Sequence, residues 1–76
     1  MKANIYIDTR GLFCPMPVIK TAEAMRPLAA GGVIEVVSDD PAIEFDLPAW
    51  CKSQGHTIEK RPAARGEFRF AVRKRV

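Results

Sequence analysis

The chain has 76 residues, of which 47% are hydrophobic and 28% are charged, and its formal net charge is +3. This size and composition are typical of one small globular domain, residues 1–76, and they exclude a second lobe or a large enclosed substrate cavity. No apolar run approaches the roughly 20 residues that cross a membrane, and the first residues lack the apolar segment of a signal peptide. We therefore expect a cytoplasmic protein without membrane contact.

The first half of the chain predicts a strand, a loop and a helix. Isoleucines at alternate positions in residues 4–8 predict a short strand, and Gly11 supplies a backbone angle that other residues resist. From Pro15 a helix is predicted, with Lys20, Thr21 and Glu23 off an apolar stripe of Val18, Ala22, Met25 and Ala29. Pro27 should kink or fray its last turn, and Gly31-Gly32 should end it.

A strand and a second helix follow. Val33–Ser38 is the strongest predicted strand, and Asp39-Asp40-Pro41 predicts a helix start with an aspartate cap. The apolar positions of that helix, at helical spacing, are Ile43, Leu47, Trp50 and Cys51. Pro48 predicts a bend or a restart near Asp46, and Gly55 should end the helix.

The last third of the chain predicts two strands, at residues 57–61 and 67–73, joined by a turn at residues 62–66. The second strand has the alternation of a half-buried strand, with Phe68, Phe70 and Val72 on one face and Arg69, Ala71 and Arg73 on the other. The whole order predicts an α+β fold. We expect a two-layer α/β sandwich, β-α-β-α-β-β, with a four-stranded mixed sheet and two helices on one face.

Cys14 stands where the first loop meets the first helix. If Cys14 is the N-cap, Pro15 occupies the first helical position, where its missing N–H costs little, and Pro17 remains within the first turn. The amide of Met16 would then point toward the sulfur. The partial positive charge of a helix start favours a thiolate, so we expect a lowered pKa for Cys14. This placement favours a functional thiol over a cysteine that only packs in the hydrophobic core.

Cys14 lacks the neighbouring cysteine or histidine that a cysteine enzyme uses for catalysis on its own. No second cysteine lies two or three positions away, and the single histidine, His56, is distant in sequence. A thiol without these groups suits a carrier that other proteins load and unload. Cys51 follows Trp50 on the apolar side of a helix and is expected to be core. The cysteine and histidine spacings do not match a zinc site, so we expect no metal and no cofactor.

Positive charge is concentrated toward the end of the chain, where residues 60–76 hold seven Lys or Arg against one acidic residue. Arg69 and Arg73, on the open sheet face, could track a phosphate backbone, so a nucleic-acid or regulatory binding module is the alternative function. No exposed set of stacking aromatics accompanies them, which disfavours nucleic acid. The same arginines could instead dock an acidic protein. Met16 could dock a partner or simply be an exposed apolar residue.

Together these residues resemble the TusA/SirA-type sulfur carrier family. The family signature has an aspartate on the first strand, then glycine, leucine, one residue and Cys-Pro-x-Pro, matched here by Asp8, Gly11, Leu12, Cys14, Pro15 and Pro17. A second stretch looks like the family's second-helix segment, with matches at Asp39, Asp40, Pro41, Ala42, Asp46, Pro48, Trp50 and Cys51. The resemblance covers essentially the whole chain.

The resemblance implies that Cys14 carries sulfane sulfur as a persulfide, in a loop shaped and held by Asp8, Gly11, Pro15 and Pro17. It implies a donor, a cysteine desulfurase or rhodanese-type protein, and an acceptor serving tRNA thiolation, molybdenum cofactor assembly or sulfur oxidation. Met16 stands where the tRNA-thiolation members tend to have glutamate, which leaves the partner open. We expect a monomer or weak self-association. Further alternatives are a redox pair of Cys14 with Cys51 and haem ligation through Cys14-Pro15.

Overall fold

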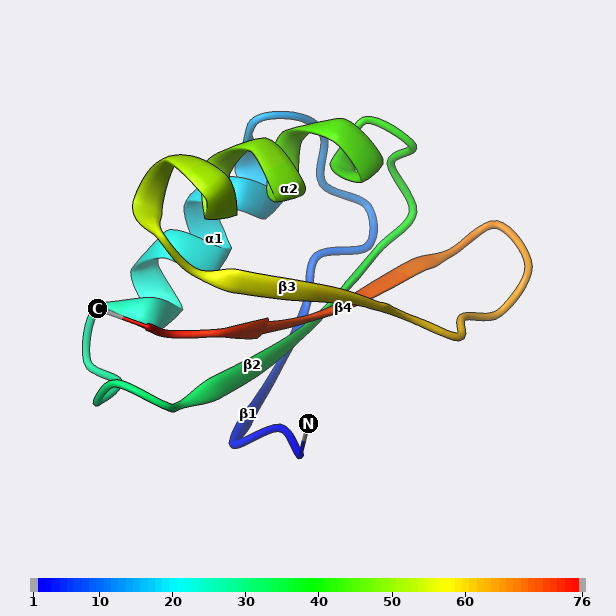
Figure 1. The fold of residues 1–76 in the computed structure, drawn as a ribbon. Helices are drawn as coiled ribbons and strands as arrows, with labels where there is room; N and C mark the ends of the chain where they lie inside the picture. Colours follow the sequence, from blue (N-terminus) through cyan, green and yellow to red (C-terminus); the bar gives the residue numbers. More distant parts are fainter. Residues whose placement is uncertain (1, 76) are drawn as a thin grey trace.

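The computed structural model describes residues 2–75 and has the element order β1-α1-β2-α2-β3-β4 (Figure 1). The elements are β1 (Ile5–Asp8), α1 (Met16–Met25), β2 (Val33–Ser38), α2 (Ile43–Gln54), β3 (Thr57–Arg61) and β4 (Phe68–Arg73). The sheet order is β1-β2-β4-β3, with β1 parallel to β2 and the other neighbours antiparallel. Both helices cover one face of this sheet (Figure 1), so the predicted two-layer α+β sandwich is confirmed. Within residues 2–75, neither helix is long and apolar enough to cross a bilayer.

The core lies between the sheet and the two helices. Alternate residues of β2 and β4 point toward the helices and are buried with one face of each helix, forming a cluster of Met25, Ile34, Val36, Ile43, Leu47, Cys51, Phe70 and Val72. Cys51 is fully buried, as its spacing predicts, and this burial raises the pKa of its thiol to about 11. Both cysteines are free thiols.

Helix α1 is shorter than its sequence pattern predicts. It ends at Met25, because the ring of Pro27 cannot donate the next hydrogen bond and crowds the preceding turn. Ala29, expected on the apolar stripe, is therefore outside the helix and exposed. Thr21, expected off the stripe, is fully buried, and its hydroxyl donates to the carbonyl oxygen of Pro17 at 2.9 Å. Burying a hydroxyl that already has a hydrogen-bond partner costs little free energy. The buried face of α1 can therefore include Thr21, although its apolar pattern alone would leave Thr21 out.

The carboxyl end of α1 is closed by Lys74 rather than by the glycines that follow it. The Lys74 amine donates at 2.8, 3.2 and 2.7 Å to the carbonyl oxygens of Met25, Arg26 and Leu28. A cation at this end satisfies free carbonyls and complements the helix dipole. Gly31 and Gly32 instead lead the chain into β2, where the Gly31 amide donates to the Lys74 carbonyl oxygen at 2.6 Å.

Helix α2 begins at Ile43 and runs unbroken to Gln54 with Pro48 inside it, so no restart occurs near Asp46. The expected aspartate cap is wrong for α2, because its N-cap residue is Ala42. The Asp40 carboxylate instead accepts a hydrogen bond from the Ala42 amide at 3.0 Å, in the turn before the helix. Gly55 ends the helix as predicted, with a φ of 80° that suits glycine.

Replacing Leu47 with alanine tests the core. Leu47 is fully buried under the sheet, so Leu47→Ala should lower the free energy of unfolding by about 2–5 kcal/mol through the cavity it leaves. Urea denaturation followed by circular dichroism measures the loss. Ile19→Ala on α1 is the matched control, since Ile19 is 41% exposed, and it should cost about 1 kcal/mol or less. Equal losses in the two variants would contradict this core.

Candidate functional site

The parallel pairing of β1 with β2 brings two loops together. Because the carboxyl ends of parallel strands meet at one edge of a sheet, the loop of residues 9–15 lies beside the loop of residues 39–42 (Figure 1). The first loop is anchored at Thr9, whose hydroxyl and amide donate to the Val37 carbonyl oxygen at 2.7 and 2.8 Å. Thr9 is buried. The position of Cys14, in the first loop, is therefore set by both strands.

Two aspartates of the second loop hold the backbone of the first. The Gly11 amide donates to the two carboxylate oxygens of Asp39 at 3.0 and 3.2 Å, and the Cys14 amide donates to Asp40 at 2.8 Å. Gly11 has a φ of 83°, which confirms the predicted backbone angle that other residues resist. Hydrogen bonds from the amides of Ala42 and Cys14 lower the pKa of Asp40. Asp40 therefore holds both the Cys14 loop and the turn that leads into α2, and Asp39 holds the Cys14 loop at Gly11.

Asp8 supports the same loop through Arg10. The Asp8 carboxylate accepts hydrogen bonds from the Arg10 amide at 3.0 Å and from its guanidinium at 2.9 and 2.8 Å. Arg10 also donates to Glu67 at 3.1 Å. These contacts, the side-chain hydrogen bond first, lower the pKa of Asp8 to about 2. Asp8 thus ties the start of the loop to the segment that enters β4.

The Cys14 side chain is exposed, and its thiol is directed at helix α2. The Sγ atom donates a hydrogen bond to Oδ2 of Asp46 at 2.7 Å. This hydrogen bond, together with desolvation and the charges of Asp46 and Asp40, raises the pKa of Cys14. The lowered pKa expected from a helix start is therefore wrong.

The reason lies in where α1 begins. Pro15, not Cys14, is the N-cap, and the peptide bond between Cys14 and Pro15 is cis. The Met16 amide donates to the Phe13 carbonyl oxygen at 2.8 Å and is not free to face the sulfur. Pro15 and Pro17 have no N–H to offer. Carboxylates, rather than a helix terminus, therefore govern the charge state of Cys14.

Large apolar side chains are exposed on the two segments that meet at the thiol. Phe13 is 76% exposed, Met16 36% and Phe45 79%. Phe13 precedes Cys14 in the chain, and Phe45 precedes Asp46. These exposed apolar side chains make the two segments candidates for contact with a partner. Phe13 and Phe45 are additions to the sequence-based candidates, and the signal for Phe45 is its place off the apolar stripe of α2.

Arg69 and Arg73 lie elsewhere, on the sheet face opposite the helices. They are four residues apart on β4, about 13 Å along the strand. Arg69 forms an ion pair with Glu35 at 2.9 Å, while Arg73 is exposed. Within residues 2–75, no hydrogen bond or ion pair joins either arginine to Cys14. The structure thus does not bring these two candidates to the thiol.

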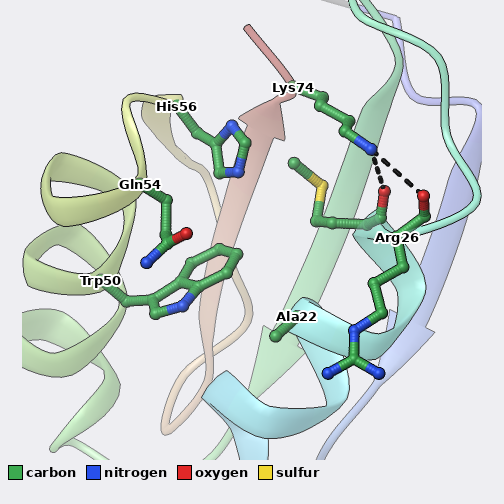
Figure 2. Close-up of a pocket in the computed structure, with 7 residues that line it drawn as sticks. Ala22, Arg26, Trp50, Gln54, His56 and Lys74 are labelled. Atoms are coloured by element: carbon green, nitrogen blue, oxygen red, sulfur yellow. Dashed lines mark hydrogen bonds between the residues drawn. The ribbon is translucent and has the colours of Figure 1, made fainter. Parts of the chain in front are cut away.

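A hollow of about 380 Å³ lies toward the carboxyl ends of the two helices (Figure 2). Its wall includes Trp50 and Gln54 from α2 and Arg26 from α1, with His56 and Lys74 closing it (Figure 2). The Trp50 and His56 rings are 5.4 Å apart. Cys14 does not line this hollow, so the thiol is presented on an open surface. In the described part of the chain, no three His, Cys, Asp or Glu side chains gather as metal ligands.

Known proteins match this chain over most of its length. The family model described as Sulfurtransferase TusA matches residues 5–74. Sulfur carrier protein TusA of Pseudomonas syringae pv. syringae (strain B728a) is 38% identical over 69 residues, which are 91% of this chain and 82% of that protein. YrkF of Bacillus subtilis (strain 168) is 50% identical over 56 residues, which are 74% of this chain but only 30% of that longer protein.

A solved structure agrees with these matches. A SirA-like protein from Desulfitobacterium hafniense has a TM-score of 0.84 to this fold at 29% sequence identity, covering 95% of this chain and 99% of that one. The family match spans all six elements and both loops of the thiol site. The chain belongs to the sulfurtransferase TusA family.

Proposed function

We propose that this protein is a sulfur carrier that holds sulfane sulfur as a persulfide on Cys14. The observation that carries the proposal is an exposed thiol on a loop whose backbone is fixed, outside the hollow. An open, fixed sulfur can be reached by the active site of another protein, whereas turnover of a small substrate needs an enclosing pocket. Relatives named as sulfur carriers support the same role.

The chemistry is an exchange between sulfur atoms and needs no oxidant or reductant. The donor protein presents a persulfide, R–S–SH. A bond forms between Cys14 Sγ and the outer sulfur while the donor's own S–S bond breaks, and the Cys14 proton ends on the donor's cysteine. Delivery repeats the step with the acceptor as the attacking group. The carrier returns to its starting thiol.

The partners follow from this chemistry and from the family. The donor is a cysteine desulfurase or a rhodanese-type protein, because each forms a persulfide on a cysteine. We place the acceptor in tRNA thiolation, molybdenum cofactor assembly or sulfur oxidation. We place the relay in the cytoplasm, where reducing conditions keep Cys14 a free thiol.

The exposed apolar side chains beside the thiol form the surface that meets the donor. Phe13, Met16 and Phe45 are exposed on the segments that carry Cys14 and Asp46. An aromatic ring that is exposed to water in the free protein contributes a large share of the binding free energy when a partner covers it.

The basic segment supports the nucleic-acid alternative less well. Its positive charges are partly neutralised by ion pairs within the protein, which join Arg69 to Glu35, Lys60 to Glu44 and Arg61 to Glu59. Phosphate binding relies on cations that are free to replace counterions. The basic segment therefore offers fewer free positive charges to a phosphate backbone than its charge count suggests.

Persulfide formation on Cys14 can be read directly by mass. Wild-type protein incubated with a cysteine desulfurase and cysteine should gain about 32 Da, one sulfur atom, and Cys14→Ser should gain none. Cys51→Ala is the matched control and should load normally, because Cys51 is fully buried. Failure of wild type to load from a panel of desulfurase and rhodanese-type donors would refute the carrier function.

The donor surface predicts a change in binding without a change in chemistry. Phe45→Ser should raise the donor concentration needed for half-maximal loading by about fivefold or more, while the maximal rate stays near wild type. Tyr6→Ser is the matched control, since Tyr6 is 68% exposed but lies on β1. Identical loading curves for Phe45→Ser and Tyr6→Ser would remove Phe45 from the donor surface.

A further inference from the structure

We propose that Asp46 is a positioning residue for Cys14, whose carboxylate holds the unloaded sulfur as a neutral thiol until a sulfur donor breaks the hydrogen bond between them. The role at loading rests on the proposed function, whereas the hold on the free thiol does not. Neither the family match nor the names of the relatives assign Asp46 a role.

Asp46 is itself held in place. It is half-buried on α2, its amide donates to the Ala42 carbonyl oxygen at 2.9 Å, and the next residue, Leu47, is fully buried in the core. The turn of helix that carries the carboxylate is therefore fixed to the sheet. Because the Asp46 carboxylate is held in place, its hydrogen bond fixes the orientation of the Cys14 side chain.

Two hydrogen bonds hold Cys14, one from its amide and one from its sulfur. Its amide donates to Asp40 at 2.8 Å, and its Sγ donates to Asp46 at 2.7 Å. The first contact fixes the backbone and the second fixes the side chain. Because both acceptors follow β2 in the chain, the sulfur is oriented by the second loop and helix more than by its own helix.

The charges around the sulfur all favour the neutral form. The groups that act on it are Asp46 on α2 and Asp40 in the loop before α2, and both are acidic. The nearest cation along its own loop, Arg10, is engaged by Asp8 and Glu67. A thiolate here would lose the proton that Asp46 accepts and would face two carboxylates. The thiol therefore stays protonated at neutral pH.

Loading must break this hydrogen bond. As Cys14 Sγ bonds to the donor's outer sulfur, the donor's S–S bond breaks and the Cys14 proton passes to the donor's departing cysteine sulfur, so Asp46 takes no part in the transfer itself. The new persulfide, once ionised, has no proton to donate and is repelled by Asp46. Asp46 thus holds the Cys14 thiol in place but does not hold the Cys14 persulfide. It also slows reaction with small electrophiles, because the thiolate is the reactive form.

The test is the pH profile of Cys14 alkylation by iodoacetamide, with the label located by peptide mass mapping. In wild type the midpoint should lie above the usual cysteine value of about 8.5. Asp46→Asn removes the negative charge at nearly constant shape, so the midpoint should fall. The rate at neutral pH should rise about tenfold for each unit of that fall, while the high-pH plateau stays the same. Asp46→Ser is a second variant and should shift the midpoint in the same direction.

Glu44→Gln is the matched control. It removes one negative charge from the same helix, but Glu44 pairs with Lys60 rather than with Cys14, so the profile should stay at the wild-type position. Circular dichroism checks that each variant is folded. A midpoint unmoved by both Asp46 variants, or moved equally by Glu44→Gln, would overturn the positioning role.

Loading by a desulfurase is measured in parallel to separate the two proposals. If wild type does not load but the Asp46 variants shift the alkylation profile, the carrier function fails and the hold on the free thiol stands. If wild type loads and the profile is unmoved, the carrier function stands and the role of Asp46 falls.

Discussion

The parallel register of β1 with β2 is the constraint on which the rest of this structure depends. It pairs Asp8 with Val37 and so places the ends of both strands side by side. The loop amides of Gly11 and Cys14 can then reach Asp39 and Asp40. A register slip of one residue would turn Ile34 away from the core and separate the two loops. The same pairing therefore buries the core and builds the thiol site.

The charge state of Cys14 shows which of two electrostatic effects dominates. A helix start contributes a partial positive charge through its free amides, and that effect fades within a turn. Here two of the first residues are prolines, and the Met16 amide is already bonded to Phe13. The Asp46 carboxylate oxygen lies 2.7 Å from the sulfur. The nearer and larger charge prevails, even though the cysteine stands beside a helix.

Local pattern was enough to predict the fold and the exposed position of Cys14. Alternation and helical spacing placed all six elements, Gly11 and Gly55 matched their backbone angles, and Cys51 matched its burial. The partners of Cys14 could not be read this way, because Asp40 and Asp46 lie 26 and 32 positions further along the chain. Thr21 was misplaced for a related reason: its burial depends on a hydrogen bond that hydropathy does not register.

Under the proposed function, the exposure of Cys14 has a consequence for the lifetime of a persulfide on it. A sulfur atom bound there stands in water, because the side chain is exposed and the hollow belongs to other residues. Small thiols such as glutathione can attack a persulfide by the same exchange that delivers it. In the described residues, no pocket encloses Cys14 and shields it from such thiols. For the proposed carrier, the fraction of sulfur delivered would then depend on whether the acceptor or a small thiol meets the persulfide first, so a high concentration of acceptor would protect the sulfur.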